Sequence, residues 1–169
     1  LIPMLIPTAS VLFVWQIFLD EKGIINNILN ALNLSQINFY DSGFSMVVII
    51  LIFVWKNCGF CVILFTAGLS NMPKSVIESA RLEGASSFKV VTKIIVPMMS
   101  PTTFFVFLMA IINSFKVFRE IFLLFGDYPN ENVYFLQNFI NNNFYNLNYS
   151  QLSAASVILT IIIVAVLLV

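Results

Sequence analysis

Residues 78–97 read ESARLEGASSFKVVTKIIVP, a charged and amphipathic stretch between two long apolar runs. The apolar runs cover about residues 43–69 and 94–125. Each can cross a bilayer core of about 30 Å, which takes roughly 20 helical residues. Connections that only join membrane helices can be short. The length and charge of the polar segment 71–93, called the elbow below, therefore predict a helix-loop-helix that contacts a partner in the aqueous phase.

The composition is that of an integral membrane protein. Hydrophobic residues make up 60% of the 169 residues and charged residues 9%, which is far from the usual mix of a soluble domain. Histidine, the commonest general base and metal ligand, is absent. Cys58 and Cys61 have the C-x-x-C spacing of redox motifs, but in an apolar run we expect them to pack as small hydrophobic residues. We expect no catalytic site, metal, bound cofactor or nucleic-acid partner in this chain.

Four apolar segments predict an all-α, polytopic bundle of transmembrane helices, with residues 1–169 forming a single domain. The expected spans are listed as about 1–19, 43–69, 94–125 and 151–169. The sequence starts and stops inside apolar runs and lacks an initiator methionine. We therefore expect a piece of a longer protein, truncated at both ends.

The basic residues predict how the chain is oriented in the membrane. Four of them lie in the elbow: Lys74, Arg81, Lys89 and Lys93. The other two connections, 20–42 and 126–150, contain only Lys22 against several acidic residues. Because basic residues near span ends favour the cytoplasm, we expect a cytoplasmic elbow and two external connections.

Local signals predict two helices within the elbow. The first can begin at Pro73, which suits a first helical turn, or at Ser75, which has the spacing of a capping box with Glu78. Gly84 can take the left-handed conformation that ends a helix, and Ser86 or its neighbour can cap the second helix. On the buried side of the second helix we expect Phe88, Val91, Ile94 and Ile95. An alternative is an amphipathic helix that only lies on lipid headgroups.

The elbow resembles the EAA loop of ATP-binding-cassette (ABC) importer permeases. That pattern is Glu-Ala-Ala, three residues, glycine, nine residues, and I-x-L-P; here it reads Glu78-Ser79-Ala80, then Gly84, then IIVP at 94–97. Landmarks similar to those of the maltose-type, sugar-importing branch follow in the same order: Trp15, Gly23-Ile24-Ile25-Asn26, Trp55, Gly59-Phe60, Ala67-Gly68-Leu69, Met72-Pro73 and Ser114-Phe115-Lys116-Val117-Phe118. The resemblance implies a type I ABC importer permease core (MetI-like).

The resemblance also implies a function and partners. It implies a multi-pass permease subunit, in a bacterial-type plasma membrane, of an ATP-driven, binding-protein-dependent importer of sugars or oligosaccharides. Its partners would be a second, homologous permease, a cytoplasmic ATPase dimer and an extracytoplasmic solute-binding protein, besides membrane lipid. ATP and magnesium would bind the ATPase, so this chain is not an enzyme. The residues implied in ATPase coupling are Glu78, Ser79, Ala80, Arg81, Gly84, Ala85 and Pro97.

Charged residues also lie inside the expected spans: Lys56 in the second, and Lys116, Arg119 and Glu120 in the third. A central Lys or Arg costs roughly 2.5–3.5 kcal/mol on insertion, so it usually faces a cavity or a partner. Lys116 and Glu120 can pair at i, i+4, or the charges can face a solute. The resemblance favours the cavity and implies a substrate pathway of Cys58, Gly59, Ala110, Asn113, Ser114, Lys116, Val117, Arg119 and Glu120. Alternatives are an ion-coupled secondary transporter that uses the buried Lys, Arg and Glu, and a membrane scaffold that recruits a cytoplasmic protein.

Overall fold

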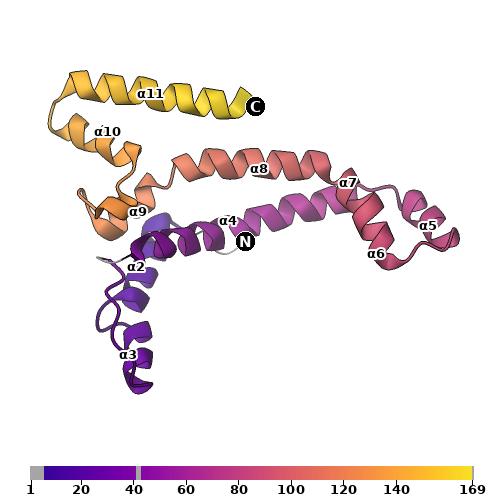
Figure 1. Cartoon of the computed structure of the whole chain (residues 1–169), viewed down its shortest axis with the longest axis horizontal. Coiled ribbons are helices and arrows are strands. Elements are labelled where there is room, and N and C mark those ends of the chain that lie inside the picture. The colour runs from indigo at the N-terminus through magenta and orange to yellow at the C-terminus, as the bar shows by residue number, and fades with distance from the viewer. Residues whose placement is uncertain (1–5, 41–42, 169) are drawn as a thin grey trace.

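The computed structural model describes residues 6–40 and 43–168 as helices joined by turns and loops, without a strand in that part of the chain (Figure 1). Two long helices, α4 (Ser45–Ser70) and α8 (Ser100–Phe115), lie side by side. The elbow joins them at one end, and most of the other helices cluster at the opposite end. The predicted all-α helix bundle is confirmed.

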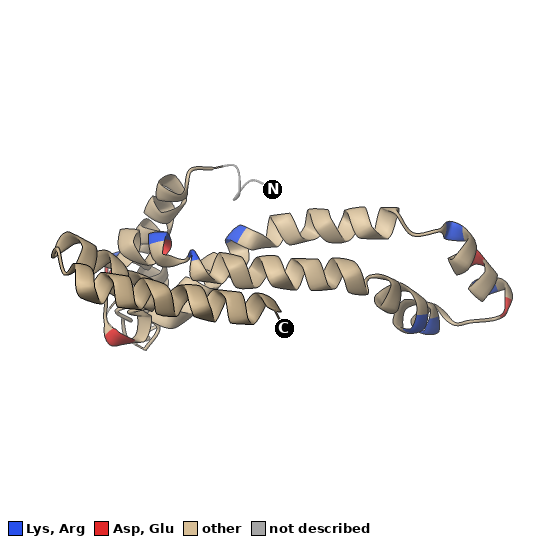
Figure 2. Cartoon of the chain, turned by 90° about the horizontal axis from the view of Figure 1, so that it is seen from above, with Lys and Arg blue, Asp and Glu red and all other residues tan. Residues whose placement is uncertain are grey.

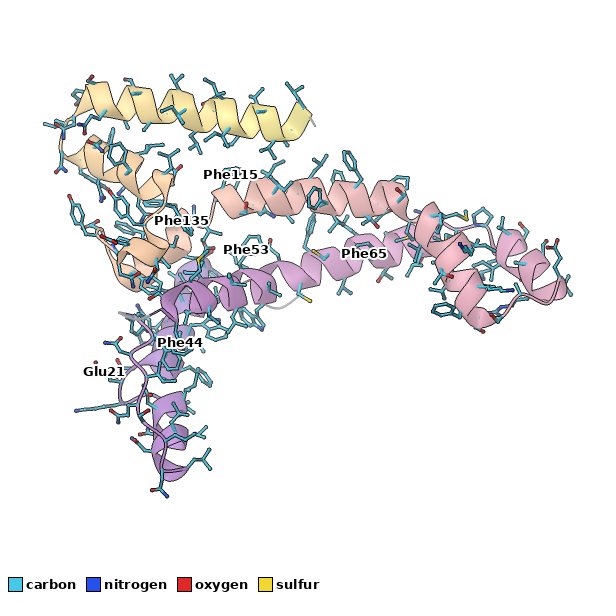
Figure 3. The ribbon with its side chains drawn as sticks, viewed as in Figure 1. Glu21, Phe44, Phe53, Phe65, Phe115 and Phe135 are labelled. Carbon is cyan, nitrogen blue, oxygen red and sulfur yellow. The ribbon has the colours of Figure 1, made fainter. Side chains whose placement is uncertain are left out.

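Two helices of the described chain are long and apolar enough to cross a membrane unbroken. They are α4, with 26 residues, and α11 (Tyr149–Leu168), with 20, and little of either is buried within this chain. In Figure 3 the side chains of α11 project both above and below the helix, and the Lys, Arg, Asp and Glu residues gather mainly towards the two ends of the molecule (Figure 2). The uncharged surface between those ends is therefore available to lipid or to other membrane helices.

Within the described residues, the helix in the first expected span, 1–19, is shorter than predicted. Helix α2 (Thr8–Leu19) has 12 residues and is about 18 Å long at 1.5 Å per residue, less than the bilayer core. Pro7 precedes it in an extended conformation, with ψ of 135°, and proline disfavours continuation of a helix on its N-terminal side. Residues 1–5 of the expected span lie outside the described residues.

The third expected span, 94–125, is bent near its start. The axis turns by 60° between residues 87–98 and residues 100–125. Proline residues at 97 and 101 flank the turn at Met99, and each lacks the N–H needed for a helical hydrogen bond. The elbow therefore continues structurally to Met98, beyond the boundary at 93 expected from the sequence.

The same expected span is broken again after Phe115, before α9 (Phe118–Phe125). The N–H groups of Lys116 and Val117 donate to carbonyls three residues earlier, at 3.0 and 3.4 Å, which tightens the turn and ends α8. The turn redirects the chain so that Val117 and Ile121 are buried. Burial of these apolar side chains against α2 and α4 offsets the loss of a continuous helix.

The connections 20–42 and 126–150 contain helices that the sequence did not predict: α3 (Ile24–Ala31) in the first, and η2 (Glu131–Val133) and α10 (Leu136–Tyr145) in the second. Fully buried Asn26 holds the first connection together. Its Nδ2 donates to the carbonyls of Asp20 and Ile37 at 3.1 and 3.0 Å, and its Oδ1 accepts from Ile37 N–H at 2.9 Å. These bonds satisfy a polar side chain that would otherwise be costly to bury.

The hydrophobic core lies at the end of the molecule away from the elbow. It joins α2, the first half of α4, α9 and η2, through the buried residues Leu12, Leu19, Val48, Ile49, Ile52, Val117, Ile121, Leu124 and Val133. The core therefore fixes how α9 meets α4.

Tyr40 packs against this core. Burial is the larger cause, and the Asp20 carboxylate the smaller cause, that raises the pKa of its phenol above 10.

Gly23, at the start of α3, is at a position where a side chain does not fit. A Cβ atom there would lie 2.6 Å from the Ile17 carbonyl oxygen and 2.8 Å from those of Phe18 and Asp20. We expect Gly23→Ala to lower the stability of the purified full-length protein by about 1–3 kcal/mol, because backbone has to move to relieve the overlap. Thermal unfolding in detergent measures the loss.

Gly43→Ala is the matched control, because no heavy atom of residues 6–40 and 43–168 would lie within 4 Å of a Cβ atom at Gly43. We expect that variant to unfold within about 0.5 kcal/mol of the parent. Equal stability of the two variants would contradict the tight packing of the chain around Gly23.

Candidate functional site

A polar cavity of about 320 Å³ lies where α4, α8 and α9 meet. It has apolar walls, including Ile49 and Phe53 from α4, and a charged lining. The sequence-predicted residues that line it are Asn113, Lys116, Val117, Arg119 and Glu120, together with Lys56, which the sequence marked as a charge inside a span. Polar groups that converge in an apolar bundle are typical of a ligand site.

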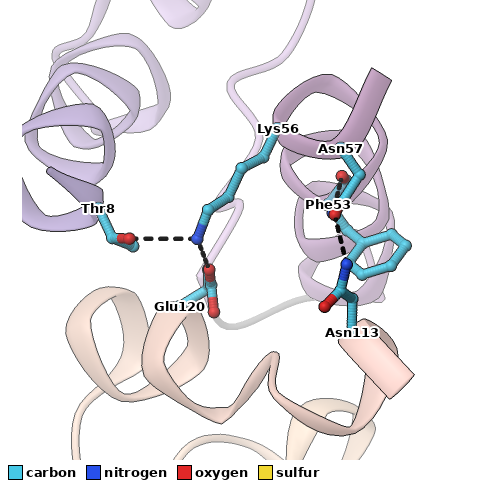
Figure 4. A network of polar contacts seen from close by, with 6 residues as sticks. All are labelled: Thr8, Phe53, Lys56, Asn57, Asn113 and Glu120. Carbon is cyan, nitrogen blue, oxygen red and sulfur yellow. Dashed lines mark hydrogen bonds and ion pairs between the residues drawn. The ribbon is translucent and has the colours of Figure 1, made fainter. Parts of the chain in front are cut away.

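Lys56 and Glu120 form an ion pair across the cavity (Figure 4). The Lys56 side chain is 30% exposed and that of Glu120 10%. Lys56 Nζ also donates to Thr8 Oγ1 of α2, at 3.1 Å. Three helices thus meet at one ammonium group, and the Glu120 charge is neutralised inside the protein.

A second polar contact joins α4 to α8. Asn113 Nδ2 donates to Asn57 Oδ1 at 3.1 Å, and Asn57 Nδ2 donates to the Phe53 carbonyl at 2.8 Å, one turn earlier on α4 (Figure 4). The two amides therefore link the walls of the cavity next to the ion pair.

The suggested pairing of Lys116 with Glu120 is wrong. The pair had the right i, i+4 spacing, but the helix is broken at Lys116 and Val117, so the two residues do not follow one another on a helix face. Glu120 pairs with Lys56 instead. Within residues 6–40 and 43–168, Lys116 and Arg119 line the cavity without an ion-pair partner.

The remaining predicted pathway residues lie elsewhere. Cys58 and Gly59 line a separate, largely apolar groove along α4 with Trp55, and both cysteines are free thiols. Ser114 Oγ donates to the Ile111 carbonyl at 2.7 Å, and Ala110 lies in α8, one turn before Ser114. The structure therefore brings together Asn113, Lys116, Val117, Arg119 and Glu120 but separates them from Cys58 and Gly59.

Three residues that line the cavity were not identified from the sequence: Ile49, Phe53 and Asn57. Thr8, which accepts a hydrogen bond from Lys56, was not identified either. Asn57 had a usable signal, because Lys56 and Asn57 are consecutive polar residues within an otherwise apolar helix of 26 residues. Thr8 and Phe53 had none, since an isolated Thr or Phe is ordinary in a membrane helix.

The elbow forms the second candidate site. Its helices are α5 (Lys74–Leu82) and α6 (Ser87–Val90), followed by the π-helical turn η1 (Val91–Ile95) and the short α7 (Val96–Met98). Helix α5 begins directly after Pro73, one of the two predicted starts, without a side-chain cap. Ser86 caps α6 as predicted, with its Oγ accepting from the Lys89 N–H at 3.4 Å.

Gly84 ends α5 in the predicted left-handed conformation, with φ of +82°. The Gly84 N–H donates to the Arg81 carbonyl and the Ala85 N–H to the Ala80 carbonyl, both at 3.0 Å. This is the pair of bonds of a Schellman motif, which satisfies the last carbonyls of the helix. The turn is therefore fixed by backbone geometry that favours glycine.

The residues assigned to coupling by resemblance lie on the elbow surface. Glu78, Ser79, Arg81, Gly84 and Pro97 are exposed, and Ala80 and Ala85 are half-buried. Their side chains are therefore accessible to a partner.

The expected buried side of the second elbow helix is wrong. Phe88 is 77% exposed and Val91 45%, Ile94 and Ile95 are half-buried, and Val90 is the buried residue at 2%. The helix is only four residues long and continues into a π-helical turn, so the regular 3.6-residue spacing used for the prediction does not hold. Leu82 is also 89% exposed, which leaves Leu82 and Phe88 at the elbow surface.

Comparison with known proteins gives one family. The family model described as "binding-protein-dependent transport system inner membrane component" matches residues 1–169. The sulfoquinovosyl glycerol transport system permease protein SmoG of Agrobacterium fabrum is 28% identical over 146 residues, which cover 85% of this chain and 47% of the relative. The trehalose/maltose transport system permease protein MalF of Thermococcus litoralis is 30% identical over 131 residues, covering 76% and 44%.

Solved structures share the fold. A bacterial ABC transporter involved in the import of the acidic polysaccharide alginate matches with a TM-score of 0.89 and 23% identity, covering 99% of this chain and 60% of that chain. The same kind of transporter in complex with an alginate pentasaccharide-bound periplasmic protein matches with a TM-score of 0.82 and 22% identity. The chain spans about half the length of the two relatives named above, at 47% and 44%.

Proposed function

The chain belongs to the family of binding-protein-dependent transport system inner membrane components, and we propose that it forms the solute pathway of an ATP-driven importer of sugars or oligosaccharides. The polar cavity at α4, α8 and α9 carries this proposal, because polar and charged groups inside an apolar bundle are costly unless they serve a solute or a partner. The relatives support the solute class, because they include permease proteins of transport systems for trehalose and maltose and for arabinooligosaccharides.

The elbow is the proposed contact with a cytoplasmic ATPase dimer, which would bind ATP and magnesium. Leu82 and Phe88 are exposed apolar residues beside the basic residues of the elbow, and exposed apolar groups with a polar rim are typical of protein contacts. Helix α5 is held at its end by the Schellman turn, and η1 and α7 link the elbow to α8. A movement of the ATPase would therefore pass through short, fixed helices to α8 and to the cavity.

The proposed assembly also contains a second, homologous permease and an extracytoplasmic solute-binding protein. The exposed surfaces of α4 and α11 are available to the second permease or to lipid. The excess of basic residues in the elbow favours a cytoplasmic elbow, which puts α3 and α10 on the external side, where a binding protein would dock. The residues proposed to contact the ATPase are Glu78, Ser79, Ala80, Arg81, Gly84, Ala85 and Pro97.

A second candidate function is ion-coupled secondary transport. The half-buried Lys56–Glu120 pair favours it, because charged pairs inside membrane proteins can form ion relays. The two functions differ in the source of energy.

Reconstitution of the complete transporter into vesicles separates them. We expect uptake of a sugar solute to stop when ATP is replaced by a non-hydrolysable analogue and to stay within about twofold when a protonophore collapses the proton gradient. Uptake that continues without ATP hydrolysis and stops with the protonophore or without a sodium gradient would support the secondary transporter and contradict the ATP-driven importer.

A further inference from the structure

The cavity has an excess of positive charge. Three cationic side chains line it, those of Lys56, Lys116 and Arg119, against one carboxylate, that of Glu120. Glu120 pairs with Lys56, so these two charges cancel. Lys116 and Arg119 remain, and neither has an ion-pair partner in the described part of the chain.

The hydrogen-bonding groups of the cavity are mostly donors. Lysine and arginine side chains donate hydrogen bonds but cannot accept them. Among the acceptors, Asn57 Oδ1 already accepts from Asn113, and one Glu120 oxygen accepts from Lys56. A neutral sugar needs acceptors as well as donors, because each hydroxyl also has a proton to donate. A carboxylate or phosphate group needs donors alone.

We propose that the cavity binds solutes that carry an anionic group, a carboxylate or a phosphate, and that Lys116 and Arg119 bind this group directly. The inference rests on the proposed function, because it names the class of solute for the same cavity. Arg119 can present two N–H groups to one carboxylate or phosphate, and Lys116 adds a third donor. The volume of about 320 Å³ is at the lower end of ligand pockets, which suits one charged sugar unit of a solute.

The position of the two cations supports direct contact. Lys116 and Arg119 are exposed, whereas their neighbours in sequence, Val117 and Glu120, are buried. The break between α8 and α9 therefore turns Lys116 and Arg119 towards the open cavity and Val117 towards the core. A structural role would be expected to give each cation an acidic partner, as Lys56 has.

The test measures binding to the purified complete permease–ATPase complex without its solute-binding protein, so that selectivity of the binding protein does not enter. The probes form two pairs that differ in charge: a disaccharide of galacturonic acid against the same disaccharide of galactose, and glucose 6-phosphate against glucose. Equilibrium dialysis with labelled probes gives each dissociation constant. We expect at least one anionic probe to bind roughly tenfold or more tightly than its neutral partner, and the two pairs distinguish a carboxylate from a phosphate.

Variants of the two cations connect the selectivity to this chain. We expect Lys116→Gln and Arg119→Gln each to weaken binding of the preferred anionic probe by roughly tenfold, with a smaller loss for Arg119→Lys, which keeps the charge. Lys22→Gln is the matched control, because it removes one exposed cation from an external connection and should leave binding within about twofold.

Three outcomes would overturn the inference: equal binding of charged and neutral probes, binding of none of the four, or anion selectivity that survives both glutamine substitutions. ATP-driven uptake by the same complex, measured in parallel, tests the proposed function separately. If uptake requires ATP while the cavity ignores charge, the solute class is wrong and the importer stands. If uptake does not require ATP, the importer itself is wrong.

Discussion

Replacing Gly84 by aspartate is expected to abolish ATP-driven uptake and co-purification of the ATPase while leaving the permease folded in the membrane. Gly84 ends α5 at φ of +82°, where a residue with a Cβ costs about 1–2 kcal/mol. Among the described residues, no heavy atom lies within 4 Å of an added Cβ, so the new side chain meets no neighbour in that part of the protein. It would project from the exposed elbow, where the proposed contact with the ATPase lies.

Gly126→Asp is the matched control for the backbone effect. Gly126 also has a positive φ, +79°, with open space around a Cβ among the described residues, but it lies in the connection 126–150, away from the elbow. We expect this variant to keep the ATPase bound. Asparagine tolerates the left-handed conformation better than most residues. Gly84→Asn therefore adds a side chain with little backbone strain and shows whether the side chain alone disrupts docking. Retention of the ATPase by Gly84→Asp, or equal loss in Gly126→Asp, would contradict the role given to the elbow.

The elbow could be predicted well from sequence where short-range rules apply. A glycine at the end of α5 and a serine at the start of α6 act within a few residues, so their backbone conformations follow from residue type. The side on which α6 is buried could not be predicted. The helix has only four residues and runs into a π-helical turn, so its side chains do not follow the regular 3.6-residue spacing of an α-helix. The exposure of Phe88 follows from that irregular geometry.

The helices of the two polar connections illustrate a different limit. The first connection was read as polar chain, yet Ile24 and Ile28 are one helical turn apart and, with Ile25 and Leu29, make an amphipathic helix of eight residues. Several asparagines obscured this pattern, because asparagine is usually a turn residue. Asn26 instead closes the connection through three hydrogen bonds to backbone, a role that depends on how residues 20–37 fold back.

The cavity shows which part of a site depends on tertiary structure. Charges are rare in apolar spans, which predicted Lys116, Arg119 and Glu120, and the family resemblance added Asn113 and Val117. The structure brings these five residues to one cavity. The partner of Glu120 was not predicted, since Lys56 is 64 residues away in sequence and the contact exists only because α9 breaks from α8 and packs on α4. The i, i+4 spacing favoured Lys116 as the partner of Glu120, but the same break takes Lys116 off the helix face on which Glu120 lies.

Removal of either charge of the Lys56–Glu120 pair is expected to destabilise the protein strongly. Lys56→Met leaves Glu120, whose side chain is 10% exposed, without a cation, and loss of one partner of a buried pair typically costs about 3–5 kcal/mol. The cost here should lie towards the lower end, because Lys56 is 30% exposed and water partly screens the charge. Thermal unfolding of the purified complex measures it.

The double variant Lys56→Met, Glu120→Met distinguishes an ion pair from simple packing. It removes both charges, so we expect it to recover most of the stability lost by either single change, since a hydrophobic pair of similar volume is often neutral or better than a buried ion pair. The matched control is Lys22→Met, which should change the unfolding temperature little because Lys22 is exposed and lies outside the bundle. Additive losses in the double variant would mean that the two residues act independently and that α4 and α9 are held together by the apolar core alone.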